Sequence, residues 1–378
     1  ASLYLFDAET EELFTRIVTE LEIEEIRSSI ENGITGWVAR RRRIANIPDP
    51  QVDARWNSAI DRQTGYTTRN ILAAPLISQH DGRFVGVLQL LNKIDASFDE
   101  FDEQMLEAFA SHAATALERV ELLQRARQSQ ELRVSIDVAR QIQTSLLPGE
   151  IPALAGYEIA VWWEPAEQVS GDYYDMLPLP DGRLGLVVAD VSGHGVGPSL
   201  IMASVRAMLK LLAGQQADLQ KIVSQLSAAV DPDLHDGRFF TMLLAALDPR
   251  SHELSYVNAG QSPAFVFDRE RRQTELLPPT RLPIGFPFEE TDRVCEPRTM
   301  RPGDVLLAAT DGLIELRDDS GEQFGRTRLE EIVRDHCDSS AGEIVAAIKR
   351  AVETFAPGDG YLDDVTLMIV KRVPSEPA

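Results

Sequence analysis

The chain has 378 residues, with 60 acidic against 37 basic side chains and a formal net charge of −23. This length predicts at least two domains, and the excess of acid argues against binding to nucleic acid or anionic membranes. The two cysteines, Cys295 and Cys337, form no C-x-x-C pair. Their number and spacing exclude a disulfide framework or thiolate zinc cluster and indicate a reducing, cytoplasmic compartment.

We expect no membrane-spanning segment, because no apolar run reaches the roughly 18 residues that a helix needs to cross a bilayer. The N-terminus also lacks the basic flank and long apolar stretch of a signal peptide. It enters a strand-like alternation directly at Ala1. We therefore expect the first domain to be truncated at its N-terminus.

Residues 1–98 mix short apolar runs with turns. The clearest strand is 83–92 (RFVGVLQLLN), which follows the turn residues Asp81 and Gly82. This organisation predicts an α+β domain built on an antiparallel sheet.

Four stretches of this region resemble a GAF domain, a small-molecule sensor: GITGWV at 33–38, NIPD at 46–49, TTRNIL at 67–72 and VGVLQLLNK at 85–93. A further pattern, N-K-x(n)-F-x3-D-E, is matched by Asn92-Lys93, Phe98 and Asp102-Glu103. It is similar to the pattern of GAF domains in cyclic-nucleotide phosphodiesterases and cyclases. The resemblance implies a cyclic-nucleotide pocket. The residues of this pattern would support the structure of the pocket and need not contact the ligand. A GAF fold that binds another small molecule, or that only dimerises, is the alternative.

Residues 99–149 predict a helical coiled-coil linker without Pro or Gly before Pro148-Gly149, which ends the helix. Apolar residues follow the 3-4 spacing of a seam at Leu106, Phe109, Ala113, Ala116, Val120 and Leu123. After the polar stretch 124–131, the seam resumes out of register at Leu132, Ala139, Ile142 and Leu146. Because so long a helix needs an apolar partner, we expect a parallel homodimer. The alternative is a helix packed on its own domains.

Residues 150–378 alternate strand-like and helical runs. The predicted strands are 157–163, 184–191, 240–247, 254–258, 305–309 and 365–370. The predicted helices are 199–212, 219–230, 328–335 and 342–355. Strands outnumber helices, which favours an α/β sandwich of antiparallel sheets flanked by helices.

Four aspartates of this region stand where an apolar strand meets a glycine-rich or acidic turn: Asp172, Asp190, Asp311 and Asp364. Carboxylates that converge without Lys or Arg repel one another, and a divalent cation removes that conflict. Carboxylate oxygens favour Mg²⁺ or Mn²⁺, and two such ions can activate water for attack on phosphorus. Taken singly, each aspartate is more simply a turn or cap residue. Their recurrence at four strand ends favours a metal centre.

The third region resembles the bacterial branch of the metal-dependent PP2C-type phosphatases, the SpoIIE/RsbU-like family. The matching stretches are VSGDYYDM at 169–176, ADVSGHGVGPSLIMA at 189–203, FFTMLLAALD at 239–248, YVNAGQSP at 256–263, LLAATDGLIELRD at 306–318, FGRTRL at 324–329 and DDVTLMIV at 363–370, preceded by ARQIQTSLLP at 139–148. The resemblance implies a protein serine/threonine phosphatase, acting on a phosphorylated STAS-domain anti-anti-sigma factor and regulated by the GAF domain through the linker.

The same resemblance implies a site with two Mn²⁺ or Mg²⁺ ions. By motif, Asp190 would bridge both ions, with the Val191 carbonyl as a backbone ligand beside it. Asp311 and Asp364 would bind the second ion, and Asp172 would bind the first, directly or through water. We expect an active enzyme, because all four acidic positions are present.

Three features depart from this scheme or compete with it. His194 lies further from Asp190 than the proposed general acid of eukaryotic-type members, so a loop role is the simpler reading. Gln261 stands where the family often has His, and we expect it to seal a loop. Cys295 and Arg301 have the C-x5-R spacing of cysteine-dependent phosphatases, but Pro297 removes a donor and the loop has no glycine, which argues for coincidence.

Two other functions compete with a phosphatase. One is a non-enzymatic, nucleotide-sensing dimeric scaffold that binds a partner protein, against which the intact aspartates argue. The other is a metal-dependent nucleotide hydrolase or cyclase, although the catalytic half contains neither a P-loop nor a glycine-rich nucleotide fingerprint.

Overall fold

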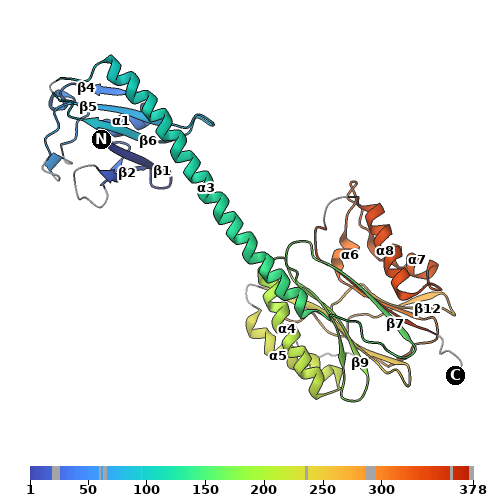
Figure 1. Ribbon diagram of the computed structural model, residues 1–378. Coiled ribbons are helices and arrows are strands. Elements are labelled where there is room, and N and C mark those ends of the chain that lie inside the picture. The colour runs from blue at the N-terminus through green and yellow to red at the C-terminus, as the bar shows by residue number, and fades with distance from the viewer. Residues whose placement is uncertain are drawn as a thin grey trace. The chain divides into compact units, whose positions relative to one another are not determined.

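The computed structural model describes residues 1–18, 26–58, 61–62, 66–94, 96–234, 237–286, 295–357 and 361–373. The chain forms two compact units, Ala1–Leu132 and Arg133–Ala378, and each has its own cores. One long helix, α3 (Glu100–Leu146), contributes its first part to the first unit and its last part to the second (Figure 1). The mixed α/β fold with antiparallel sheets, and the long helix without Pro or Gly, confirm the predictions.

The first unit is built on a six-stranded antiparallel sheet of order β3-β2-β1-β6-β5-β4. Its strands are β1 (Ser2–Asp7), β2 (Glu12–Val18), β3 (Ile26–Ser29), β4 (Ala45–Ile47), β5 (Ile71–Ile77) and β6 (Phe84–Leu91). The predicted strand 83–92 is β6, which lies in the middle of the sheet between β1 and β5. Between β3 and β5 lie the helix α1 (Gly33–Arg41) and the short 3-10 helix η1 (Pro50–Val52).

Both faces of this sheet are covered. Successive side chains of a strand point to opposite faces, so Ile71 and Ala73 of β5 join the core with α1, whereas Leu72 and Ala74 pack with α3. On α3, the buried side chains recur every four residues, at Leu106, Ala110 and Ala114. The alternative reading of the linker is therefore correct for this part of the helix, which packs on its own domain.

The predicted seam lies mostly on another side of α3. Leu106 is buried against the sheet, but Phe109, Val120 and Leu123 expose 60%, 53% and 66% of their surface. The coiled coil stays a prediction, and these exposed apolar side chains are the surface that it would bury.

The second unit contains two five-stranded antiparallel sheets. One has the order β14-β11-β10-β9-β8, with β8 (Asp172–Pro178), β9 (Leu184–Val191), β10 (Phe240–Leu247), β11 (Glu253–Ala259) and β14 (Arg298–Thr299). The other has the order β13-β12-β15-β16-β7, with β7 (Tyr157–Glu164), β12 (Ala264–Asp268), β13 (Gln273–Leu276), β15 (Val305–Ala309) and β16 (Val365–Arg372).

Helices flank the two sheets, as Figure 1 shows. The helices α4 (Val196–Gln215) and α5 (Leu219–Val230) pack on the β8–β10 sheet, and α7 (Gly325–Asp335) and α8 (Ala341–Phe355) pack on the other. Two short helices, η2 (Asp231–Asp233) and α6 (Asp311–Glu315), complete the described elements. A third core fills the space between the sheets. The central strands read as continuous apolar runs because both of their faces are buried.

Within the described part of the chain, one helix, α4, is long and apolar enough to cross a membrane, contrary to our expectation from the apolar runs. Its buried side chains include Met202, Val205 and Leu209, which lie in the core beneath β8 and β9. Packing in that core accounts for these buried side chains, whereas Leu200 and Leu211 of the same helix are exposed.

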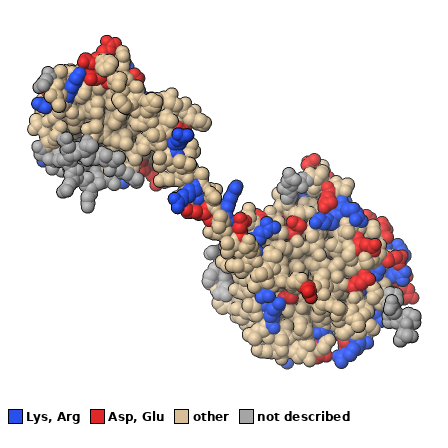
Figure 2. All heavy atoms as spheres, viewed as in Figure 1, with Lys and Arg blue, Asp and Glu red and all other residues tan. Residues whose placement is uncertain are grey.

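Basic and acidic side chains are interspersed on the visible face of the second unit (Figure 2). On that face, the acidic excess of the chain is not gathered into one large patch.

Candidate metal centre

Two of the predicted aspartates face each other across neighbouring strands. Asp172 begins β8, Asp190 lies one residue before the end of β9, and the two are direct partners in the antiparallel register. Both share strand parity with residues of the inter-sheet core, such as Met176 and Val188. Like charges placed directly opposite each other destabilise a sheet, so this pair needs compensation.

The opposite sheet brings the other acidic segments to the same end of the sandwich. Asp311 is the first residue of α6, just after β15, and Asp364 immediately precedes β16. The two segments are in close contact, because a Cβ added to Gly312 would lie 2.1 Å from the Asp364 carbonyl oxygen. Only glycine permits this approach of the two backbones.

The Asp172 carboxylate is almost completely buried, with 1% of its residue surface exposed. Its Oδ2 accepts hydrogen bonds from the hydroxyls of Thr310 (2.8 Å) and Thr366 (2.6 Å), which both belong to the opposite sheet or its edge. Burial, followed by repulsion from Asp190, raises the pKa of Asp172 well above its usual range. Asp172 therefore links the two sheets at the cost of a buried acidic group.

Asp190 is the electrostatic centre of the cluster. Burial, and then repulsion from Asp311 and Asp363, raises its pKa to about 7. The pKa of Asp311 is also raised, first by burial and then by Asp363. Asp190, Asp311 and Asp363 thus repel one another across the two sheets. No lysine or arginine is among the groups that shift their pKa values. Oxygen donors in this state match a hard divalent cation such as Mg²⁺ or Mn²⁺.

Asp364, which the resemblance assigns as a metal ligand, is engaged otherwise in this structure. Its two carboxylate oxygens accept backbone N–H groups from Ala166 (2.8 Å) and Gly171 (2.7 Å), and the residue is 3% exposed. It fastens the 166–171 segment to the start of β16. The neighbouring Asp363 is exposed and repels both Asp190 and Asp311, whereas Asp364 repels Asp190 and Asp172.

The sequence interpretation did not name Asp363, and the strand pattern gave no signal for it. In β16, Thr366, Met368 and Val370 point between the sheets, and Asp364 shares their parity. Asp172 and Asp190 have the parity of the same core, so parity alone does not choose between the two neighbouring aspartates.

The backbone of Val191 lies beside the same cluster. Its N–H donates to the Gly171 carbonyl (3.3 Å), and its own carbonyl oxygen would lie 2.8 Å from a Cβ placed on Gly171. Among the described residues, no three His, Cys, Asp or Glu side chains are already grouped closely enough to hold an ion. The carboxylates approach closely enough to repel one another, but their oxygens are not yet arranged around a single point.

The three secondary features have ordinary roles. His194 Nδ1 lies 2.8 Å from Glu167 Oε1 on an exposed loop. Gln261 is buried, accepts from the Thr241 hydroxyl (2.8 Å) and donates to the Ala309 carbonyl (2.7 Å), which confirms that it seals a loop. The Cys295 thiol donates to the Tyr256 hydroxyl at 3.2 Å.

In the first unit, the residues of the GAF-type pattern bind one another. Lys93 pairs with Asp102 and with Asp99 (3.1 Å), and the Asn92 amide donates to the Thr67 carbonyl (2.9 Å). The Asn46 amide reaches both Glu103 (2.8 Å) and the Phe98 carbonyl (3.0 Å). These bonds fasten the end of β6 and the start of α3 to the sheet.

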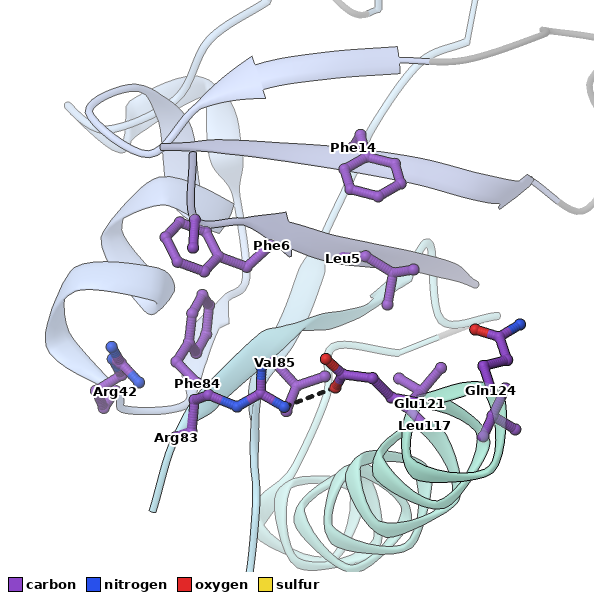
Figure 3. A pocket seen from close by; sticks show the side chains of 12 residues that line it. Leu5, Phe6, Phe14, Arg42, Arg83, Phe84, Val85, Leu117, Glu121 and Gln124 are labelled. Carbon is purple, nitrogen blue, oxygen red and sulfur yellow. Dashed lines mark hydrogen bonds and ion pairs between the residues drawn. The ribbon is translucent and has the colours of Figure 1, made fainter. Parts of the chain in front are cut away.

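Several open pockets lie in the described part of the first unit, among them the following two. One, of about 400 Å³, lies between β1, β6 and α3, has apolar walls that include Leu5, Val85 and Leu117, and carries the Arg83–Glu121 ion pair (2.7 Å) at its edge (Figure 3). The other, of about 390 Å³, lies beside α1 and is more polar. It is lined by Glu31, Asn32, Gly33, Trp37, Arg40, Ala54, Arg55, Trp56, Asn57 and Ser58.

A family model described as "Stage II sporulation protein E (SpoIIE)" matches residues 180–373, which is 194 of the 378 residues. The chain belongs to the SpoIIE family. A second model, described as "GAF domain", matches residues 1–117. This SpoIIE-family chain therefore joins a GAF domain to a PP2C-type phosphatase domain, as its sequence predicts.

Curated relatives match either part of this SpoIIE-family chain. Protein IcfG of Synechocystis is 28% identical over 64% of this chain and 42% of its own length. "Phosphoserine phosphatase RsbU" of Bacillus subtilis is 26% identical over 64% of this chain and 71% of its own length. "Probable 3',5'-cyclic phosphodiesterase pde-5" of Caenorhabditis elegans is 34% identical over 36% of this chain and 20% of its own length. The chain thus spans less than half of IcfG and a fifth of pde-5.

A solved structure shows the same fold. The SiaA-PP2C domain of Pseudomonas aeruginosa aligns with a TM-score of 0.56 and 24% identity, covering 65% of this chain and 99% of the SiaA domain. At this identity the likeness shows the fold of the SpoIIE-family domain and nothing finer.

Proposed function

We propose that this SpoIIE-family chain is a metal-dependent phosphatase that removes phosphate from serine or threonine of a signalling protein. The observation that supports it best is the set of mutually repelling carboxylates Asp190, Asp311 and Asp363, which come from both sheets and have no lysine or arginine among the causes of their pKa shifts. RsbU, which is similar over the same region, is named a phosphoserine phosphatase.

In this proposal two Mn²⁺ or Mg²⁺ ions are held by Asp190, the Val191 carbonyl, Asp311 and Asp363, with Asp172 acting directly or through water. Asp363 takes the place that the resemblance gives to Asp364, since both Asp364 oxygens accept backbone hydrogen bonds. When bound, such ions supply Lewis-acid stabilisation of phosphoryl oxygens and make water more acidic. The chain itself fixes the carboxylates at strand ends and excludes solvent from Asp172.

Hydrolysis of p-nitrophenyl phosphate by the full chain, with Mn²⁺ present, tests the proposal. We expect Asp311→Ala to lose activity by about 100-fold or more, on the scale of losing an electrostatic group at a reacting centre. The matched control is Asp335→Ala, which removes an exposed aspartate at the end of α7. An inactive wild type, or an Asp311→Ala variant as active as the control, would favour a non-enzymatic scaffold.

The proposed substrate is a phosphorylated STAS-domain protein in the cytoplasm, as the family resemblance implies. Release of phosphate from a phosphoserine STAS protein, compared with an unrelated phosphoserine protein of similar size, measures this preference. Equal rates on both would leave the phosphatase intact and remove the STAS assignment.

A homodimer through α3 is proposed from the apolar side chains that this helix leaves exposed, among them Val120, Leu123 and Val134. A second copy of the helix would bury them in a coiled coil. Light scattering of the full chain should give a dimer, and Leu123→Glu should shift it towards monomer. An unchanged mass for that variant would place the contact elsewhere.

The proposed effector is a cyclic nucleotide in the polar pocket beside α1. Arg40 and Arg55 supply cationic groups, which pair here with Glu31 (3.1 Å) and Asp53 (2.6 Å). The Arg55 guanidinium also covers Trp37 at 4.6 Å, so a ligand that draws it away would find a flat apolar surface there. An anionic phosphate attached to a purine fits that combination. Calorimetry with cAMP and cGMP tests it, with Arg55→Met expected to abolish binding.

A further inference from the structure

One side chain of α3 is buried where the helix is otherwise mostly exposed. Gln143 exposes 4% of its surface, whereas its neighbours Ile142 and Thr144 are exposed. It lies one helical turn before Leu147, which enters the core formed by α4, α5 and β8–β10. The end of α3 is therefore attached to the second unit by one polar and one apolar side chain on the same face.

The Gln143 amide bonds both main-chain groups of a single residue. Its Nε2 donates to the Ser170 carbonyl at 2.6 Å, and its Oε1 accepts from the Ser170 N–H at 2.9 Å. Such a two-point contact imitates the bonding that a neighbouring strand would offer. The ladder between β8 and β9 begins only at Asp172, so Ser170 lies just outside it.

Ser170 begins a short segment that touches the candidate metal centre at each position. The Ser170 hydroxyl accepts from the Asp172 N–H (3.0 Å), and the Gly171 N–H donates to Asp364 (2.7 Å). Gly171 also lies against the backbone of Val191, with no room for a Cβ. The backbone that Gln143 holds is the one that presents Asp172 and lies against the neighbour of Asp190.

We propose that Gln143 is a positioning residue, through which the end of α3 sets the backbone that presents Asp172 and thereby the affinity of the centre for divalent cations. The proposal rests on the proposed function, since it concerns the same site. A rotation or shift of the end of α3 would break the two bonds to Ser170. The site then has a direct mechanical input from the helix that carries the exposed apolar residues.

Gln143→Leu keeps the size of the side chain and removes both bonds. We expect Mn²⁺ affinity, measured by calorimetry on the full chain, to fall by about 10–100-fold, the range found when a group that orients metal ligands is removed. Hydrogen exchange of the 166–172 backbone should rise in the absence of metal. The matched control is Gln141→Leu, which makes the same substitution at an exposed position of the same helix.

A purely structural role predicts a different result. In that case Gln143→Leu would lower the unfolding temperature in EDTA while the folded fraction bound Mn²⁺ as tightly as the control, and the proposal would be overturned. If Gln143→Leu does not fold, Gln143→Glu decides, because its carboxylate can still accept from the Ser170 N–H but can no longer donate to the Ser170 carbonyl. Unchanged Mn²⁺ affinity in a folded Gln143→Glu would then overturn the proposal.

The two proposals fail separately. A wild-type chain that binds no Mn²⁺ refutes the proposed metal centre and, with it, the role of Gln143. A wild type that binds Mn²⁺ as tightly as Gln143→Leu refutes the role of Gln143 alone.

Discussion

The two units use acidic side chains in opposite ways. In the first unit, Lys93 lies between Asp99 and Asp102, and these partners raise its pKa. In the second, Asp190 and its neighbours raise one another's pKa values instead. A charge that is paired within the chain stabilises the fold. Unpaired charges of one sign repel one another and destabilise it until a bound cation neutralises them.

The largest effect is expected where one repelling carboxylate is removed. Asp190→Asn should abolish Mn²⁺ binding and lower phosphatase activity by 100-fold or more. The same change should raise the unfolding temperature of the metal-free chain by several degrees, because a raised carboxyl pKa costs the folded state about 1.4 kcal/mol per unit at neutral pH. Thermal scans in EDTA measure this gain. A lower melting temperature would mean that Asp190 is paired and not repelled.

The neighbours Asp363 and Asp364 allow a repelling carboxylate to be compared with a hydrogen-bonded one at adjacent positions. Asp363→Ala should weaken Mn²⁺ binding at least tenfold and should not destabilise the metal-free chain, because it removes a charge that repels Asp190 and Asp311. Asp364→Ala should lower the stability of the metal-free chain by about 1–3 kcal/mol, since it leaves the Ala166 and Gly171 N–H groups without their acceptors. Denaturant unfolding and calorimetry separate the two. Reversed outcomes would restore Asp364 as the ligand.

The pH dependence follows from the raised pKa of Asp190, about 7 in the folded chain. Between its unfolded value and about 7, the metal-free folded state holds more protons than the unfolded state, so its stability falls as pH rises through this window. Protons compete with cations for the same oxygens, so Mn²⁺ affinity should fall about tenfold per pH unit below 7. Calorimetry at pH 6, 7 and 8 measures the slope, and a flat profile would contradict it.

The smallest effect is expected in the first unit. Lys93→Met removes the partner of Asp99 and Asp102, and it should lower the unfolding temperature of that unit slightly, because the pair is partly exposed. Mn²⁺ affinity should not change. A variant that weakened Mn²⁺ binding would show that the pairing in the first unit and the repulsion in the second are coupled.

Sequence reasoning was most successful where burial dictates composition. The strands β9, β10, β15 and β16 are covered on both faces and read as continuous apolar runs, so their positions were predicted within one or two residues. The strand β8 was missed because DYYDMLP mixes polar and apolar residues. The strand β12 was missed although it is as short and as buried as β15, which was predicted.

The ligand set stays a prediction, and the structure brings its acidic positions to one end of the sandwich. Asp190, Asp311 and Asp364 could be identified because each adjoins an apolar strand, and Asp172 because it follows Ser170 and Gly171 in a family motif. The choice between Asp363 and Asp364 depends on which oxygens meet backbone N–H groups some 200 residues away in the chain, at Ala166 and Gly171. Gln143 gave no signal either, because a glutamine in a polar helix looks like a surface residue until its contact with Ser170 is known.

The two threonine hydroxyls that converge on one oxygen of Asp172 have a consequence for genetics. Asp172→Ala would leave both threonine hydroxyls buried without an acceptor. Its phenotype would therefore combine a loss of stability with a loss of activity. A clean loss-of-activity allele is better placed at Asp311, whose carboxylate accepts from its own backbone N–H and that of Gly312 and holds no pair of buried hydroxyls.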